Sequence, residues 1–363
     1  MRASSVMLDF RAFLGDRPVD RRALLRLALA IPFARVLAPR RVRVVLVGAP
    51  DPSLADALAF GVDEATRSAQ PFGVAVALER AADAAAVTAA RDTALVLFGG
   101  DDAADCRAVA ARARTLGAVY VDAWCGLDAW TRRADGCARA IVHVAPSDAM
   151  RVDALGAGAP EALRARRWLV TTADASDAQM LLAVRGARAL GAAGATVVGL
   201  VGQTRTDGAA HDALLHVGTT IEARLADDAR PLRAVGWHAS LEPYGGAQLG
   251  DRFRGAVHRP MDERAWAAWA GVKLVVEAAL RAGAAESIAQ RLARADFIFD
   301  AHKGVPLFVR AEDRQLVQPL YLVRAGDDGA DTVVATAPRV GGGDPRARLA
   351  ALGREPHACG AGA

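Results

Sequence analysis

Short runs of β-branched and other apolar residues alternate with longer alanine-rich stretches along most of this chain. The short runs are typical of strands, whereas the alanine-rich stretches have helical character. The predicted strands cover residues 43–47, 73–78, 94–98, 118–121, 140–144, 168–171, 196–200 and 231–235. The predicted helices between them cover residues 53–68, 102–116, 147–155, 176–190 and 207–215. This alternation predicts an α/β fold of mostly parallel sheets flanked by helices.

The last third of the chain has a different pattern. After two further predicted helices come three β-rich segments with no helix between them, at residues 305–309, 316–323 and 332–336. Earlier in the chain, Gly156, Gly158 and Pro160 interrupt the helical pattern before a new strand begins. These helix-breaking residues predict a boundary between two lobes. We expect the late strands to cross back and complete a lobe that is already built.

These patterns divide the chain into five parts. The expected parts are an export leader over residues 1–40, a first α/β lobe over 41–160, a second α/β lobe over 161–300, a β-rich crossover segment and lobe completion over 301–340, and a flexible tail over 341–363.

The first forty residues have the features of an export leader. Arg21 and Arg22 precede an apolar stretch at residues 27–31 that is too short to span a bilayer as a helix. Their order resembles a twin-arginine signal, although Leu24 stands where phenylalanine is commoner. The alternative is an ordinary amphipathic helix with a chance arginine pair. The leader predicts a periplasmic protein, with the cleavage site left open because Pro39 would impede a peptidase.

The charge distribution argues against a partner that binds through a large basic surface, such as nucleic acid. The chain carries a formal charge of +4, and seven arginines against three aspartates in residues 1–38 account for all of it. A neutral body provides no basic surface for nucleic acid. We find no later apolar run long enough for a membrane span, so we expect neither nucleic acid nor a span after leader removal.

The four cysteines are compatible with an oxidising compartment. Cys125 and Cys137 flank a short segment that a disulfide could close, and Cys137 to Cys359 is the competing pairing. Cys106 falls inside a predicted helix, where a buried free thiol is an equally good interpretation. The cysteine and histidine spacing matches no metal motif, so no metal is expected.

Catalytic motifs are missing from the sequence. We find no G-x-S-x-G elbow, no H-E-x-x-H and no P-loop lysine. The first predicted strand leads into Gly48, Ala49 and Pro50, which cannot form the glycine cradle of a dinucleotide site. We therefore expect neither an enzyme nor a cofactor.

Several ordered segments resemble a known family. They are HVAPSDAM at residues 143–150, GWH at 236–238, YGGAQL at 244–249, WAAWAGVK at 266–273, FDAHKGVPL at 299–307 and QLVQPL at 315–320. The first resembles type I periplasmic substrate-binding proteins of ABC transporters, in the branched-chain amino acid class. The others are similar to a subgroup associated with PQQ-dependent alcohol dehydrogenase systems. The segment at residues 308–313 departs from that subgroup's pattern.

The resemblance implies a function and partners. Proteins of this family capture a small molecule between two lobes and deliver it to a permease that is driven by an ATPase. The subgroup adds a quinoprotein alcohol dehydrogenase system as a further partner. A second class of function stays open, because the same fold serves ligand-sensing receptors and regulators.

Within the family, ligand contacts come from loops that follow strands, which in the first lobe of this chain are the segments 98–101 and 122–124 and the helix start at 147–148. The residues expected to bind ligand here are Gly99, Gly100, Asp101, Asp122, Ser147 and Asp148 in the first lobe, with Trp237 and His238 in the second. Each has a simpler structural interpretation. Ser147, like Ser53 and Ser176, is equally well placed to cap a helix, and the two glycines could serve a turn alone.

A reporter fusion tests the leader. Residues 1–45 fused to a reporter should carry it across the inner membrane, and Arg21→Lys combined with Arg22→Lys should block export if the twin-arginine route is used. Continued export of the double variant would leave only the general secretory route.

Overall fold

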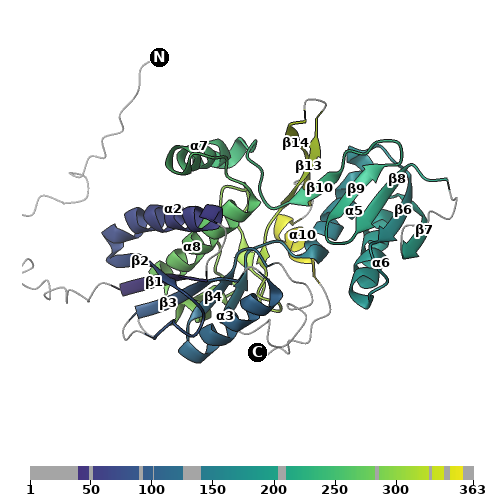
Figure 1. Cartoon of the computed structure of the whole chain (residues 1–363). Coiled ribbons are helices and arrows are strands. Elements are labelled where there is room, and N and C mark those ends of the chain that lie inside the picture. The colour runs from purple at the N-terminus through teal and green to yellow at the C-terminus, as the bar shows by residue number, and fades with distance from the viewer. Residues whose placement is uncertain are drawn as a thin grey trace, which may run out of the picture. The chain divides into compact units, whose positions relative to one another are not determined.

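The structure is a computed structural model of the 363-residue chain. It describes residues 40–48, 52–89, 93–100, 102–125, 140–202, 210–282, 286–326, 329–338 and 344–354 (Figure 1). The leader expected over residues 1–40 therefore lies outside the described residues, apart from Arg40.

The first sheet of the described residues contains five parallel strands in the order β2-β1-β3-β4-β5. These strands are β1 (Arg40–Val47), β2 (Val74–Ala81), β3 (Thr93–Gly99), β4 (Val119–Asp122) and β5 (Ile141–His143). Helices α2 (Pro52–Ala69) and α8 (Glu263–Arg281) cover one face, and α3 (Ala103–Leu116) covers the other (Figure 1). The short helix α9 (Ile288–Leu292) follows α8.

The second sheet contains seven described strands in the order β14-β13-β10-β9-β8-β6-β7. These are β6 (Arg167–Thr172), β7 (Thr196–Gly202), β8 (Ala213–Val217), β9 (Ile221–Leu225), β10 (Leu232–Val235), β13 (Leu320–Ala325) and β14 (Asp331–Ala337). Because β9 and β13 run antiparallel to their neighbours, this sheet is mixed. Helices α5 (Asp148–Ala162) and α6 (Asp177–Ala192) pack against each other and against it.

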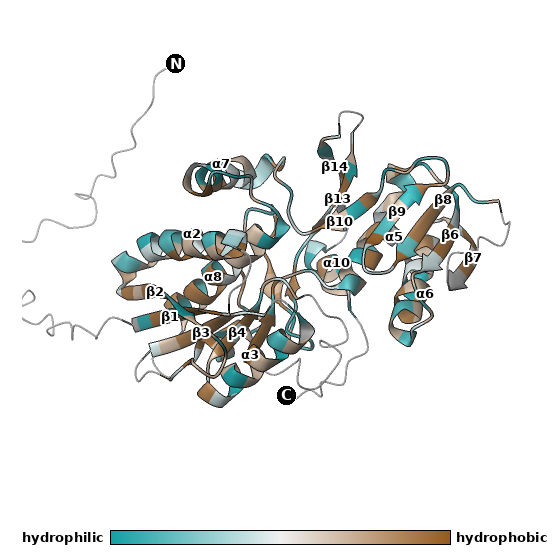
Figure 2. Ribbon diagram, in the orientation of Figure 1, coloured by the Kyte–Doolittle hydropathy of each residue, from teal (hydrophilic) through white to brown (hydrophobic). Residues whose placement is uncertain are grey.

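Local sequence explains where the helices begin. Ser147 and Ser176 accept hydrogen bonds from backbone N–H groups in the first turns of α5 and α6, which confirms two of the three expected caps. Ser53 lies inside α2, which begins at Pro52. The Asp102 carboxylate caps α3 in the same way, accepting from Ala104 N at 2.7 Å. The strands are mostly hydrophobic, whereas the helices that cover them are hydrophilic on their outer faces (Figure 2).

Helix α8 packs closely over α2 and the first sheet. A Cβ on Gly61 of α2 would lie 3.1 Å from the Trp269 Cα atom, and a Cβ on Gly271 of α8 would lie 2.7 Å from a Val121 methyl. Trp266 and Trp269 are buried in this interface. A helix that follows strands β6 to β10 of the second sheet in sequence thus provides a large part of the first lobe's core.

The chain therefore divides differently from the expected domain boundaries. It passes between the sheets in three described segments: residues 144–147, residues 236–262 and residues 318–319, named here the first, second and third crossovers. Helix α5, expected in the first lobe, packs on the second sheet, and α8, expected in the second lobe, packs on the first. The glycines from which the boundary between the lobes was predicted, Gly156 and Gly158, do not interrupt α5. They lie inside this helix, where they allow close packing against Ala189 and Leu322.

Some predicted elements need correction. Residues 213–217 form strand β8 and not the end of a helix, because Ala213, Leu215 and Val217 are buried in alternation. Helix α7 (Gly246–Val257) and strand β9 were not expected from the sequence. The predicted segment 316–323 divides into β12 (Leu316–Val317) and β13, with β12 paired to β11 (Phe308–Val309).

The C-terminal segment is not wholly a loose tail. Within the expected tail over residues 341–363, Pro345–Ala351 form helix α10, capped by Asp344. Leu349 packs against Phe308 and Val317, while Leu352 joins the core of the second sheet. Burial of these two leucines stabilises the folded segment, which its glycine-rich and proline-rich composition did not indicate.

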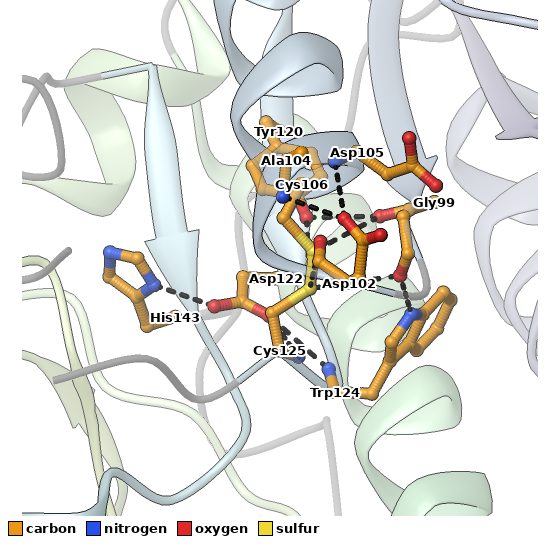
Figure 3. Close-up of a disulfide and its surroundings, with 11 residues drawn as sticks. Gly99, Asp102, Ala104, Asp105, Cys106, Tyr120, Asp122, Trp124, Cys125 and His143 are labelled. Atoms are coloured by element: carbon orange, nitrogen blue, oxygen red, sulfur yellow. Dashed lines mark hydrogen bonds and ion pairs between the residues drawn. A yellow bond between two sulfur atoms is a disulfide. The ribbon is translucent and has the colours of Figure 1, made fainter. Parts of the chain in front are cut away.

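A disulfide joins Cys106 to Cys125 (Figure 3). Cys106 lies in the first turn of α3 and Cys125 follows β4, so both lie at the carboxyl edge of the first sheet. The bond replaces the expected pairing of Cys125 with Cys137, because that interpretation did not anticipate that a helix start and a strand end meet at one edge. Cys137 and Cys359 lie outside the described residues, and their pairing stays a prediction.

Within the described residues, no helix combines the length and apolar character needed to cross a membrane.

Peptide mapping and unfolding test the disulfide. Non-reducing digestion of exported protein should recover Cys106 and Cys125 in one linked species. Replacing both with alanine should lower the free energy of unfolding by about 3 kcal/mol, since the unfolded chain regains the freedom of the closed loop. Wild-type protein unfolded under reducing conditions is the control and should lose at least as much stability as the double variant, because reduction would also break a Cys137 to Cys359 bond. A bond between Cys125 and Cys137 would contradict this connectivity.

Candidate functional site

The predicted ligand residues lie at the carboxyl edges of the two sheets. In the first sheet all strands are parallel, so β1, β3, β4 and β5 end at one edge. In the second sheet β6, β8 and β10 also end together, beside the start of β13. The crossovers leave and enter the sheets at these edges. The two edges are where α/β folds hold ligands.

Gly99 and Gly100 form the turn after β3, and both require glycine. Gly99 has φ 150° and Gly100 has φ 91°, which other residues rarely adopt. A Cβ on Gly100 would lie 2.6 Å from the Cys106 nitrogen. Their carbonyl oxygens accept hydrogen bonds from the Tyr120 hydroxyl and the Trp124 indole (Figure 3). The turn therefore orients the Trp124 ring.

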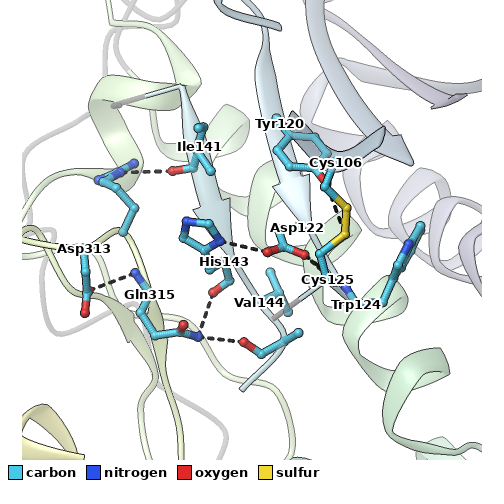
Figure 4. Close-up of polar contacts among 12 residues, drawn as sticks. Cys106, Tyr120, Asp122, Trp124, Cys125, Ile141, His143, Val144, Asp313 and Gln315 are labelled. Carbon is cyan, nitrogen blue, oxygen red and sulfur yellow. Dashed lines mark hydrogen bonds and ion pairs between the residues drawn. A yellow bond between two sulfur atoms is a disulfide. The ribbon is translucent and has the colours of Figure 1, made fainter. Parts of the chain in front are cut away.

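Asp122 is buried at the end of β4. One carboxylate oxygen lies 2.8 Å from His143 Nδ1, and the other accepts from the backbone N–H groups of Trp124 and Cys125 (Figure 4). Both Asp122 and His143 are about 1% exposed. The carboxylate thus fixes the loop after β4, and its oxygens are occupied by protein groups.

Strand β5 and the residues after it are held by the connection between β11 and β12, which precedes the third crossover. Gln315 donates from its side-chain nitrogen to the carbonyl oxygens of His143 and Ala145, at 3.1 and 2.9 Å (Figure 4). Arg314 donates to the Ile141 carbonyl at 3.1 Å. These contacts, together with the backbone bridge between His143 and Gln315, provide donors for buried backbone acceptors in β5 and just after it.

Ser147 and Asp148 start helix α5. The Ser147 hydroxyl accepts from Met150 N at 3.2 Å, so it acts as a cap in this structure. Asp148 lies in the first helical turn, where a carboxylate is favoured by the helix dipole. A ligand role for these two residues stays a prediction.

Trp237 and His238 follow β10 in the second crossover. Trp237 is 2% exposed and its ring stacks on Trp266, with centroids 6.0 Å apart. It is therefore a packing residue in this structure. His238 is half-buried, and its Nδ1 lies 2.8 Å from the Ser240 hydroxyl. Burial lowers the pKa of His238 below its ordinary value, and the charges of Asp331 and Arg233 act in opposite directions on it.

The structure brings Gly99, Gly100 and Asp122 together around the disulfide, and Asp101 lies outside the described residues. Two further side chains lie at the same edges: Trp124, in the segment 122–124 from which the resemblance also implies ligand contacts, and Thr172, which was not predicted. Trp124 is half-buried after β4, with its ring fixed by the Gly100 carbonyl. Thr172 ends β6, and its buried hydroxyl has no hydrogen-bond partner among the described residues. An unsatisfied hydroxyl at a strand end is a signal that only the structure provides.

A separate groove lies on the outside of the first lobe. It has a volume of about 770 Å³, is lined mainly by α2 and α8, and contains none of the predicted ligand residues. Among the described residues, no group of histidine, cysteine, aspartate or glutamate is arranged to hold a metal ion.

No protein-family model matches the sequence, and a search of curated proteins finds no match. Solved structures do match. A substrate-binding protein of an ABC transporter from Sphaerobacter thermophilus superposes with a TM-score of 0.61 at 17% identity, covering 83% of this chain and 98% of that one.

Two further neighbours contain ligands. A solute-binding protein from Rhodopseudomonas palustris in complex with benzoate has a TM-score of 0.56 at 15% identity, covering 82% and 96% of the two chains. LivJ from Streptococcus pneumoniae in complex with isoleucine has a TM-score of 0.54 at 16% identity, covering 82% and 98%. The chain thus has the type I periplasmic binding protein fold, which confirms the expected fold class.

Unfolding measurements test the packing role of Trp237. Trp237→Ala should lower the free energy of unfolding by about 3–5 kcal/mol, because it leaves a cavity against Trp266. Phe72→Ala is the control, since Phe72 is 74% exposed and its truncation should have little effect. Equal stabilities of the two variants in denaturant titrations would show that Trp237 is not packed in the core.

Proposed function

We propose that this chain is the exported solute-binding component of an ABC transporter, which captures a small molecule between its two lobes. The observation that carries the proposal is the meeting of the two carboxyl edges at the crossovers. A ligand that contacts both edges favours the closed arrangement over the open one, whereas contact with one edge shifts nothing. No covalent chemistry is needed for this function.

The ligand class that we favour is a small organic carboxylate. The ligands named for two solved neighbours, benzoate and isoleucine, share a carboxylate group. In this chain α5 and α6 both begin at the carboxyl edge of the second sheet with serine caps. Backbone N–H groups at such helix starts favour an anion. Trp124 would provide an aromatic surface in the first lobe, and the Thr172 hydroxyl a hydrogen bond in the second.

The proposal includes a location and partners. The leader supports the periplasm, reached by the twin-arginine route, and the partners would be a permease and its ATPase. The resemblance of residues 266–273 and 299–307 to one subgroup supports a link to PQQ-dependent alcohol oxidation. In such a system the cargo would be an acid or related small molecule derived from alcohols.

Thermal melting with a ligand panel tests the function. The panel contains benzoate, isoleucine and short-chain acids that form when alcohols are oxidised. A true ligand at a hundred times its Kd should stabilise the folded state by about 2.7 kcal/mol. Small-angle scattering should then show a smaller radius of gyration. Binding without any change in that radius would contradict capture by lobe closure.

Variants test the two candidate contacts. Trp124→Ala should weaken ligand binding by about 1–3 kcal/mol if the ring packs on the ligand. Thr172→Val keeps the side-chain shape and should weaken binding only if the hydroxyl bonds the ligand. Phe72→Ala is the matched aromatic control, because Phe72 lines the outer groove and is exposed. Unchanged affinity in both test variants, measured by calorimetry, would place the site elsewhere.

A further inference from the structure

Lys303 is a buried lysine at the place where the crossovers meet. It lies in the segment after α9, and only 3% of it is exposed. Its ammonium group donates to the Gly236 carbonyl in the second crossover. It also donates to the Gln318 side-chain oxygen at 2.6 Å and to the Pro319 carbonyl at 3.3 Å, both in the third crossover. All three donors of the ammonium therefore have acceptors.

Gln318 extends this connection to the first crossover. Its side-chain nitrogen donates to the Val144 carbonyl at 2.7 Å, while its oxygen accepts from Lys303. An ammonium can only donate and a carbonyl can only accept, so the two contacts set the orientation of the amide. One lysine and one glutamine thus bind all three described crossovers.

The crossovers are also in close contact around this pair. A Cβ on Gly236 would lie 2.9 Å from the Pro146 ring and 3.4 Å from the Gln318 side-chain oxygen. The second crossover therefore has no room for a side chain at this point.

Aromatic rings enclose the remaining faces of the ammonium. Lys303 Nζ lies 3.9 Å from the Trp266 ring centroid and 5.3 Å from the Tyr321 ring centroid. Trp266 belongs to α8 over the first sheet, and Tyr321 belongs to β13 in the second. Lys303 thus lies between rings from the two lobes. Burial lowers the pKa of its amine well below the ordinary value, while the Glu263 charge raises it. The same low dielectric strengthens the hydrogen bonds that hold the amine.

The geometry points to Lys303 as a positioning residue that sets the angle between the two lobes by holding the crossovers together. A hinge motion must change backbone torsions in the crossovers. Such a change moves the Gly236 and Pro319 carbonyls relative to each other, and Lys303 resists it. The inference rests on the proposed function only in that lobe motion serves ligand capture.

A role in stability alone is the competing explanation. Arg112 provides a matched control, because its guanidinium also donates to backbone carbonyls, those of Val87 and Ala85, but entirely within the first lobe. Losing either cation should reduce stability. Only the loss of Lys303 should change the crossovers and the interlobe angle.

The experiment compares Lys303→Met with Arg112→Met in the full exported chain without ligand. Hydrogen exchange in peptides covering residues 144–151, 236–241 and 320–325 should become roughly tenfold or more faster in Lys303→Met, and should stay unchanged in Arg112→Met. Small-angle scattering should show a changed radius of gyration in Lys303→Met alone. Equal behaviour of the two variants in both measurements would overturn the inference.

Gln318→Glu provides a second test that does not depend on the folding of Lys303→Met. Glutamate keeps an acceptor for Lys303 but removes the donor to Val144. Exchange should therefore become faster in residues 144–151 and stay unchanged in residues 236–241. Unchanged exchange in residues 144–151, or an equal increase in both segments, would contradict the described connection. Since no ligand is present, the outcome does not depend on whether the ligand panel succeeds.

Discussion

The arrangement of the two lobes depends on hydrogen bonds from a few buried side chains to backbone carbonyls in the crossovers. Where the backbone passes from one sheet to the other, it no longer has neighbouring strands as hydrogen-bond partners. A buried carbonyl without a hydrogen bond lowers the stability of the folded state. Gln315, Gln318 and Lys303 supply the missing donors and are each at most 3% exposed. Because each donor contacts segments that are distant in sequence, satisfying these carbonyls also fixes how the lobes are joined. Lys303 and Gln315 each donate to three acceptors, so removing either would take the donor from several buried acceptors at once.

The same crossovers explain why neither lobe is made from one continuous stretch of chain. Residues 263–281 return from the second sheet to pack as α8 on α2, and β13 and β14 then return to the second sheet. The Trp237 and Trp266 rings stack between the second crossover and α8. The Arg151 and Glu263 pair, at 2.9 Å, links α5 to the start of α8. The core of each lobe is therefore complete only when the chain has passed through the other lobe and returned.

At the first carboxyl edge, most polar groups serve the loops themselves. The Asp122 carboxylate is occupied by His143 and by two backbone N–H groups, and the disulfide fixes Cys125 against the start of α3. Loops held in this way are preorganised, which reduces the entropy that a ligand must overcome on binding. The side chains left to face a ligand are then those that the loops orient, of which Trp124 is the clearest example among the described residues.

Local sequence determined the α/β class, most strand and helix positions, and the serine caps of α5 and α6, because periodicity and capping depend on neighbours in the chain. It also contained a resemblance to type I binding proteins, and the chain has the fold of those proteins. Only tertiary structure decided which sheet α5 and α8 cover, because an apolar helix face does not specify its partner. The Cys106–Cys125 bond likewise depends on a helix start and a strand end meeting in space. In the sequence, nothing distinguishes Lys303 from an ordinary polar residue in a loop. Its three acceptors, on Gly236, Gln318 and Pro319, come together with it only when the chain is folded.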